Sequence, residues 1–567
     1  MQGIDKITFQ VISTGLTGIV REMQLLLFRT GYSTAIRESQ DASCAILDRQ
    51  GRLVAQFRSL YMHMGIFPVM MEALFHHYPP SRMEEGDVYI LNHPYHGGST
   101  HVSDMGIMAP VFYRGELVAF CASMAHKTDI GGSVPGSASA QTTEIYQEGL
   151  LLPPLKFVSR GRVNQEIEAI LRANSRTPEI IIGDMRGQIG VCRIGEDRIG
   201  KLMDKYGRDA ILGAFQEGMD RTEKMVKNRI SQWPDGAVTV EAFLDPDGLQ
   251  LHTPVKLQLT LFKKGEELLF DFTGSDDQTQ SPLNLKPSGV LSACYFGVIA
   301  MIGPSLPNNA GLAGAVRTKF RPHSVLNPDP PGPVSCYVYT LGKVLHMVLA
   351  ALRRVSGQKP IAESGKGGAL TIGGHSLLTG DPYIQYELFG GGGGAVEGDD
   401  GVSNSYGSRG VPGRIMEVPL EIIETEFACR MLRYELIPDS GGPGQFRGGP
   451  GIRREYLILD QEARLGWRSI GFVYPAVGDE GGLPGRVSTA SLQPAAGERR
   501  AFPCRIADVR LKAGDILRID TGGGGGVGDP RKRPRDKVLG DREDGYITER
   551  GAAEDYGLKD GPAAGGA

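Results

Sequence analysis

One segment of the chain, residues 92 to 132, concentrates side chains that can bind a metal or move a proton. It holds four of the eleven histidines, two aspartates and two pairs of adjacent glycines: His93, His96, His101, Asp104, His126, Asp129, Gly97–Gly98 and Gly131–Gly132. Imidazole and carboxylate groups around glycines, which permit close approach of the backbone, are typical of a metal site. We interpret His101, Asp104 and His126 as metal ligands, and we take the remaining members as candidate catalytic residues: His93, His96 and Asp129.

The same segment reads as a β-hairpin. Two apolar, strand-like runs flank a turn signal: residues 105–113, Arg114-Gly115 and residues 116–124. With a two-residue loop Ser103 would face His126, whereas with a three-residue loop Asp104 would face it. The pattern leaves this register open. In both cases His101, Asp104 and His126 meet at one end of the hairpin, and one further ligand has to come from elsewhere.

A single histidine in a glycine-rich loop often bonds only the backbone, but three such residues together favour Mn, Fe or Zn. Two pairs of carboxylates could support them. Glu38 and Asp41 could point toward one site; the alternative is a turn-capping Asp41 and a solvent-exposed pair of Glu38 with Arg37. Glu144 and Glu148 would share one face of a helix. We expect these two to accept ring N–H bonds from the ligand histidines, against the alternative of a solvated face.

The length and composition are those of a soluble multidomain protein. The 567 residues exceed what one hydrophobic core supports, and 41% are hydrophobic. A net charge of −4 without a basic stripe argues against nucleic acid as a partner, and the basic run 531–537 is expected to form a solvated turn. Charges in the first thirty residues, and a longest apolar run of only residues 290–302, predict no signal peptide and no membrane span. Seven scattered cysteines without a CxxC pair indicate a reducing cytoplasm.

The periodicity predicts an α+β, multidomain fold. An N-terminal domain of mixed helices and hairpins, residues 1–232, would carry the metal site. A mixed middle domain would follow at residues 233–430, then a β-rich C-terminal domain at 431–531 and an exposed helical tail at 532–567. Glycine accounts for 79 residues, many of them in runs within the later domains. Because strand-like segments flank these runs, we expect tight turns and close backbone packing rather than disordered linkers.

Several motifs together resemble the hydantoinase B family over roughly residues 4 to 557. They read IRESQDASCAILDRQG, NHPYHGGSTHVSD, AHKTDIGG, YQEGLLLPP, DFTGS, DSGGPGQFRGGPG and TGGGGGVGDP. That family includes the B subunits of N-methylhydantoinase-type enzymes, the corresponding half of 5-oxoprolinase and the alpha subunit of acetone carboxylase. The combined set is specific, whereas one glycine run alone would be weak.

The resemblance implies a metal-dependent B subunit of an ATP-dependent cyclic amide hydrolase that opens hydantoin, 5-oxoproline or lactam rings. An A-type partner would bind ATP and phosphorylate the substrate oxygen, which agrees with the lack of a phosphate-loop motif in this sequence. The B subunit would finish the reaction at one divalent ion, Mn, Zn or Fe. The family ligands map onto Asp41, His101, Asp104 and His126. The implied assembly is a cytoplasmic hetero-oligomer.

Two alternatives accompany this interpretation. One is an alpha-type subunit of an ATP-dependent ketone carboxylase, in which the metal would stabilise an enolate that captures CO2. The other is a non-catalytic scaffold for the A subunit, which the retention of His101, Asp104 and His126 argues against. The chain also departs from the family at one position, because His93 stands where the family usually has Asp in N-D-P-Y. This change replaces an acceptor-only group with one that can donate or titrate.

Overall fold

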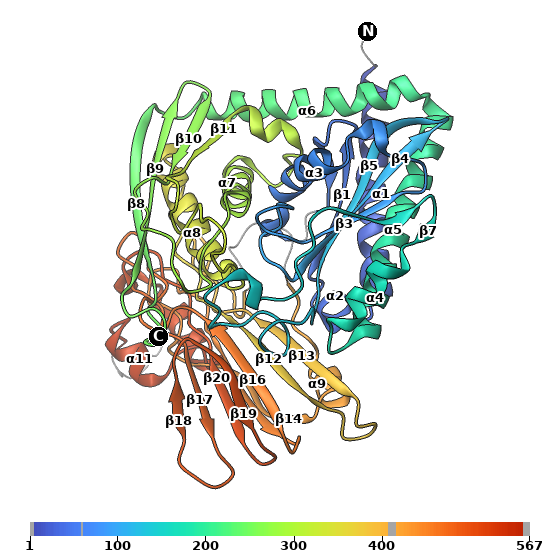
Figure 1. The fold of residues 1–567 in the computed structure, drawn as a ribbon. Helices are drawn as coiled ribbons and strands as arrows, with labels where there is room; N and C mark the ends of the chain where they lie inside the picture. The colour runs from blue at the N-terminus through green and yellow to red at the C-terminus, as the bar shows by residue number, and fades with distance from the viewer. Residues whose placement is uncertain (1–4, 58–59, 406–414, 559–567) are drawn as a thin grey trace.

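The computed structural model describes residues 5–57, 60–405 and 415–558. Within these ranges the chain forms four β-sheets with helices packed against them (Figure 1). The predicted α+β, multidomain class is therefore confirmed. Three bodies of structure follow one another along the chain, and the candidate site lies where side chains from all three meet.

The N-terminal body is built on a seven-stranded sheet in the order β2-β1-β5-β4-β3-β6-β7. Its strands are β1 Ala42–Asp48, β2 Leu53–Gln56, β3 Val88–Leu91, β4 Asp104–Tyr113, β5 Glu116–His126, β6 Leu155–Ser159 and β7 Arg162–Val163. Helices α1 Lys6–Thr30 and α5 Pro178–Tyr206 cover one face, and α3 Ile66–His77 covers the other (Figure 1). Side chains of successive β4 residues point to opposite faces of the sheet, so that Ile107 packs on the α1 side and Met108 on the α3 side.

Helix α1 is long and apolar enough, by length and composition, to cross a membrane, and it is the one such helix in the described ranges. The same apolar residues also form the core of this body. They recur every three or four positions and are buried against the sheet and α5: Ile12, Leu16, Ile19, Met23 and Leu27. The pattern thus has a structural role in the folded chain.

The middle body follows the long helix α6 Arg208–Ile230. Its sheet has the order β11-β10-β9-β8, with β8 Gly236–Leu244, β9 Val255–Lys264, β10 Glu267–Asp271 and β11 Val316–Lys319. Helices α7 Pro287–Ile302 and α8 Tyr337–Ser356 pack on this sheet and on each other. The uniformly apolar α7 is buried along most of its length, as such a sequence predicts. The first turn of α8 reaches the candidate site.

Two sheets enclose the C-terminal core, whose largest buried side chain is Trp467. One has the order β13-β12-β16-β19, with β12 Gly368–His375, β13 Pro382–Phe389, β16 Ala463–Ser469 and β19 Arg505–Leu511. The other has the order β14-β15-β20-β17-β18, with β14 Cys429–Leu436, β15 Ile452–Ile458, β17 Thr489–Gln493, β18 Arg500–Phe502 and β20 Ile516–Asp520. Because β12 pairs with β16, the boundary predicted at residue 430 falls between two strands of one sheet.

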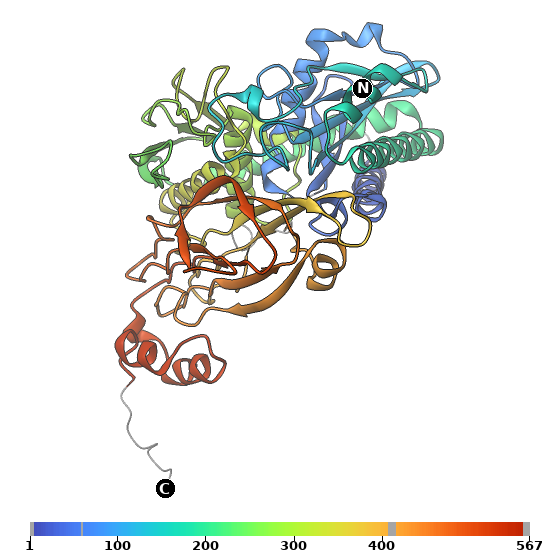
Figure 2. The same ribbon diagram turned by 60° about the horizontal axis from the view of Figure 1, so that its bottom comes forward.

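The remaining α-helices of the described chain are shorter: α2 Thr34–Arg37, α4 Gln165–Ala173, α9 Leu420–Glu426, α10 Arg535–Glu543 and α11 Glu549–Glu554. The last two form the tail, which Figure 2 shows in red beyond the sandwich strands. The basic run at 531–537 is not simply a solvated turn. The side chain of Arg533 is 1% exposed and forms ion pairs of 2.7 Å with Asp400 and Asp541. This buried pairing fastens the tail to the glycine-rich region.

The glycine runs pack backbone against backbone, as expected from their strand-like flanks. The runs at 390–394, 441–442, 448–449 and 522–526 are buried. Gly449 N donates to Gly393 O at 2.8 Å, and Gly524 N donates to Gly449 O at 3.0 Å. A Cβ on Gly524 would lie 2.1 Å from Gly393 O, closer than real Cβ contacts allow. Glycine is therefore required here by the approach of neighbouring backbones.

Candidate metal centre

The hairpin β4–β5 sets the geometry of the centre through its turn and one bulge. Both turn residues, Arg114 and Gly115, have positive φ, 52° and 81°, and close a two-residue loop. A β-bulge beside Val111 then shifts the register by one residue, so that Asp104 pairs with His126. The structure thus combines the shorter of the two expected loops with the facing pair that the longer loop predicted.

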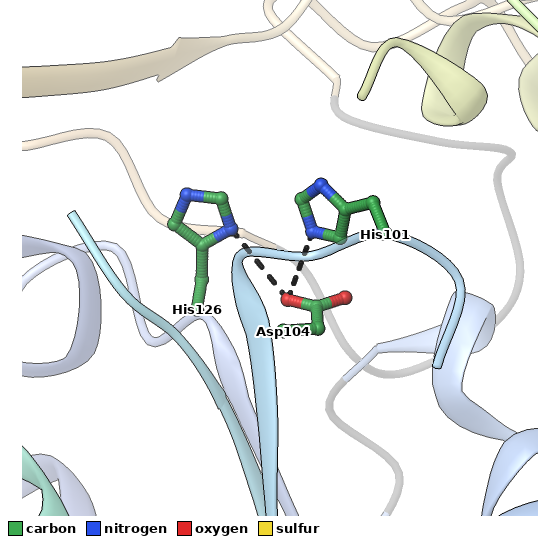
Figure 3. A group of neighbouring side chains, drawn as sticks. All are labelled: His101, Asp104 and His126. Atoms are coloured by element: carbon green, nitrogen blue, oxygen red, sulfur yellow. Dashed lines mark ion pairs between the residues drawn. The ribbon is translucent and has the colours of Figure 1, made fainter. Parts of the chain in front are cut away.

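Asp104 lies between two histidine rings (Figure 3). Its Oδ1 is 3.1 Å from His101 Nε2 and 3.5 Å from His126 Nδ1. One donor atom from each of the three residues lies within 4.8 Å of the others, and all three side chains are buried. His101 belongs to the loop before β4, whereas Asp104 begins β4 and His126 ends β5. The structure therefore brings together the three residues that the sequence placed at one end of the hairpin.

Asp41 lines the same cavity from the residue before β1. Its backbone oxygen accepts a hydrogen bond from His126 N at 3.1 Å. Burial, and after it the charge of Asp104, raise the pKa of Asp41 well above its usual range. Asp41 and Asp104 line the same cavity, and a cation there would lower the cost of ionising both. Glu38 instead pairs with Arg37 at 2.7 Å, which is the alternative expected for it.

His63 is a member of the centre that the sequence did not assign. It ends the short 3₁₀ turn η1 Tyr61–His63 and is fully buried. Its Nδ1 is 2.9 Å from Ser43 Oγ, and its Nε2 lies 3.5 Å from Asp104 Oδ2. The concentration of histidines from residue 63 onward was the available signal, but the residue is separated from the hairpin by α3. His63 reaches Asp104 through tertiary packing, because Met62 and Met64 on either side of it are buried in the core of the middle body and η1 packs against α7 and α3.

Aromatic rings from the other two bodies close the cavity. The ring of Tyr386, on β13, stacks on His126 at a centroid distance of 4.4 Å and an angle of 15°. The ring of Tyr337, at the start of α8, lies 4.9 Å from that of His101, and its hydroxyl is 3.4 Å from Asp104 Oδ2. The remaining lining residues are Met62, Ala138, Ser335, Val338, Tyr339, Ala369, Leu388, Ile415 and Arg468. The centre is thus an interior site assembled from all three bodies.

The electrostatics suit metal ligands. Burial opposes ionisation of Asp104, but interactions with His101, His126 and His63 hold its pKa well below the usual range. Burial lowers the pKa of His126 to about 4, despite the hydrogen bond to Asp104 that favours protonation. Near neutral pH the centre therefore presents an ionised carboxylate beside a neutral imidazole, the forms that bind a metal.

The donor set fits a divalent transition metal. The two imidazoles and the carboxylate that lie together, with Asp41 lining the same cavity, suit Mn, Fe or Zn better than Ca or Mg, which prefer oxygen ligands throughout. A cation would also relieve the repulsion between Asp41 and Asp104. His101 Nδ1 and His126 Nε2, the ring nitrogens that do not face Asp104, have no hydrogen-bond partner among the described residues. Among the described residues, each of these two rings therefore has its polar contact on the nitrogen that faces Asp104.

His93 and His96, expected to be catalytic, do not line this cavity. Nδ1 of His93 accepts hydrogen bonds from Tyr95 N at 3.1 Å and His96 N at 3.3 Å, which fastens a turn. Burial, followed by the neighbouring His96 and Lys286 side chains, lowers the pKa of His93 to about 4. The exposed His96 lines a separate surface cavity beside α3, together with His76. The structure gives neither histidine a contact with Asp104.

Asp129, the third candidate catalytic residue, fastens a loop. Its two carboxylate oxygens accept hydrogen bonds from Gly131 N, Gly136 N and Arg176 N, and from Arg176 Nη1 at 2.9 Å. It is buried but is not among the residues that line the centre. Both of its oxygens accept hydrogen bonds from the loop and from Arg176, so Asp129 holds the loop in place.

Glu144 and Glu148 flank a single 3₁₀ turn, η3 Ile145–Gln147, and not an α-helix. Neither accepts a ring N–H from a histidine in the described chain, so the predicted supporting hydrogen bonds are not made. Glu148 Oε1 instead accepts from Val334 N and Ser335 N, each at 2.8 Å. The buried Glu148 therefore anchors the loop that leads into α8 and its Tyr337.

These features define a multidomain protein with a buried histidine–carboxylate centre at the junction of three bodies. The chain belongs to the Hydantoinase B/oxoprolinase family, whose model matches residues 5–530. The resemblance proposed from the sequence motifs is thereby confirmed across nearly the whole chain.

Some relatives match this chain along nearly their entire length. The caprolactamase subunit beta of Pseudomonas jessenii is 29% identical over 98% of this chain and 96% of its own. The crystal structure of the ATP-dependent caprolactamase from that organism superposes with a TM-score of 0.88 at 27% identity, covering 98% and 97% of the two chains. A nucleotide-free acetone carboxylase superposes with a TM-score of 0.87 at 18% identity, covering 98% and 80%, which shows a shared fold.

Proposed function

We propose that this chain is the metal-dependent B-type subunit of an ATP-dependent cyclic amide hydrolase. One observation carries the proposal: His101, Asp104 and His126 converge in the interior with Asp41 beside them. Burying ionisable groups together is costly unless they are paired or bind a metal. A scaffold for another subunit would not need such a set. The full-length likeness to a caprolactamase subunit supports the amide class of substrate.

In this proposal Asp41, His101, Asp104 and His126 hold one divalent ion. When bound, the ion would act as a Lewis acid and lower the pKa of water. The chain's own residues prepare the site for it. Asp104 stays ionised and orients the rings of His101 and His126, and Tyr337 and Tyr386 exclude bulk water, which strengthens every electrostatic interaction inside.

We further propose that ATP is bound by an A-type partner. An amide is a poor electrophile, and phosphorylation of its oxygen would supply a leaving group before the ring reaches this chain. The sequence has no G-x-x-x-x-G-K-[ST] loop that would bind the nucleotide here. We place the complex in the cytoplasm, because all seven cysteines are free and buried.

The test combines metal analysis of the purified A–B complex with turnover of hydantoins, 5-oxoproline, lactams and acetone. We expect ring opening of a cyclic amide only when ATP, metal and both subunits are present. Substrate-stimulated ATP hydrolysis by this chain alone would contradict the assignment of ATP to the partner. Carboxylation of acetone without turnover of any cyclic amide would favour the ketone carboxylase instead.

A further inference from the structure

A buried arginine without a carboxylate partner lines the candidate metal cavity. Arg468 lies near the end of β16 and is 3% exposed. Its Nη2 donates to Thr371 Oγ1 at 3.0 Å, and the hydroxyl of Tyr339 is the other side-chain group that interacts with the guanidinium. A guanidinium stays charged and carries five N–H donors. Most of its capacity is therefore unused by the part of the chain that the structure describes.

The other buried arginines show what this protein normally does with such a charge. Each of the four pairs with at least one carboxylate in the described structure: Arg447 with Asp541, Arg454 with Glu387 and Glu417, Arg505 with Asp247, and Arg533 with Asp400 and Asp541. Arg505 is the cross-strand neighbour of Arg468. Arg505 thus has a carboxylate partner, whereas Arg468 has none among the described residues. Because an unpaired buried charge is costly, core packing does not explain why Arg468 is an arginine.

The carboxylates of the cavity do not neutralise the charge of Arg468. Asp41 and Asp104 line the same cavity, yet neither forms an ion pair with Arg468. Both would be neutralised by a divalent cation, which leaves the guanidinium uncompensated. Its backbone is also held firmly, because β16 pairs with β12 on one side and β19 on the other, and Tyr339 donates its hydroxyl to Arg468 O at 2.8 Å. A rigid, unpaired arginine is a preorganised anion-binding group.

We propose that Arg468 is the anion-binding residue of this cavity and takes an oxyanion, phosphate or carboxylate, of the ligand that binds beside Asp104. Planar guanidinium groups bind both anions in a bidentate manner. The identity of the ligand rests on the proposed function: a phosphorylated ring amide carries the first anion, and the opened ring carries the second. Arg468 would thus select ligands by charge, whereas the histidine–carboxylate centre holds the metal.

The experiment is calorimetric titration of inorganic phosphate, and separately of acetate, into the full chain loaded with Zn²⁺. We expect Arg468→Met to weaken binding of at least one anion tenfold or more while keeping normal metal content. Arg468→Lys, which keeps the charge but loses the fork, should weaken it less. The matched control is Arg464→Gln on the same strand, where an exposed arginine pairs with Asp508 at 2.6 Å; it should bind within twofold of wild type.

Stability separates a ligand-binding arginine from a structural one. Removing an uncompensated buried charge should leave the melting temperature of the metal-free Arg468→Met protein equal to or above that of wild type. Arg505→Met, which strands Asp247, should lower it.

A wild-type chain that binds neither anion, an Arg468→Met variant that binds both within twofold of wild type, or a lowered melting temperature in that variant would overturn the proposal. Weakened phosphate binding alone identifies a phosphate ligand, and weakened acetate binding alone identifies a carboxylate. The titration requires no turnover, so loss of cyclic amide hydrolysis in the wild-type complex would contradict the proposed function and leave this inference standing.

Discussion

Replacing His101 with alanine should remove the metal and the overall turnover while the chain still folds. The truncation deletes Nε2, which lies 3.1 Å from Asp104 Oδ1 and is one of the proposed donor atoms. Structural zinc sites with four ligands bind with roughly 10–16 kcal/mol. Each donor then contributes about 3 kcal/mol, so the loss of one should weaken metal binding on the order of 100-fold.

The same truncation should lower the free energy of unfolding of the metal-free protein by less than it lowers that of the metal complex. The His101 ring packs on Tyr337 at 4.9 Å and on His126 at 5.2 Å, and such aromatic contacts are worth about 0.5–1.5 kcal/mol each. Asp104 keeps His126 and His63 near it, which limits the penalty of the lost hydrogen bond. We expect a total cost of roughly 2–4 kcal/mol, which lowers the melting temperature without unfolding the chain.

The assay is metal content by mass spectrometry, combined with thermal melting and product formation by the assembled complex. The complex carrying His101→Ala should still assemble and retain partial ATPase activity, uncoupled from product. The matched control is His96→Ala, which removes an exposed histidine from the same sequence segment and should keep full metal content. Full metal occupancy together with near-normal product formation in His101→Ala would refute the centre as described.

Three further perturbations test other parts of the structure. Burial raises the pKa of Glu148 to about 7, whereas the carboxyl of the unfolded chain titrates near 4.5. The unfolded state therefore loses its proton first as pH rises, and the free energy of unfolding should fall by about 3 kcal/mol between about pH 4.5 and about pH 7. Urea denaturation of Glu148→Gln should show a flatter dependence on pH. Gly524→Ala would place a Cβ 2.1 Å from the Gly393 oxygen and should cost about 3 kcal/mol or more, seen as lost soluble protein, whereas the unobstructed Gly18→Ala in α1 should stabilise the chain by about 0.5–1 kcal/mol. His63→Ala should weaken metal binding about 10–100-fold in equilibrium dialysis through lost support of Asp104, and unchanged affinity would remove His63 from the centre.

Local sequence patterns predict helices and strands because the spacing of apolar side chains follows the period of the element to which they belong. The strand-like runs expected at residues 105–113 and 116–124 are β4 and β5. Pairing between distant strands was beyond such patterns. The sheet that joins β12 to β16 crosses a predicted domain boundary, because hydrogen bonds between remote strands leave no local period.

The sequence by itself determined which residue types form the centre and that His101, Asp104 and His126 meet at one end of a hairpin, since a turn and two strands suffice for this convergence. Tertiary structure decided which other residues belong there. It brought in His63 and Arg468 and left His93, His96 and Asp129 in turns and loops. The physical reason is that spacing along a strand specifies which neighbours share a face, whereas contact across α3, α8 and the C-terminal sandwich depends on how separate cores pack. The bulge beside Val111, a departure of one residue, finally set Asp104 opposite His126.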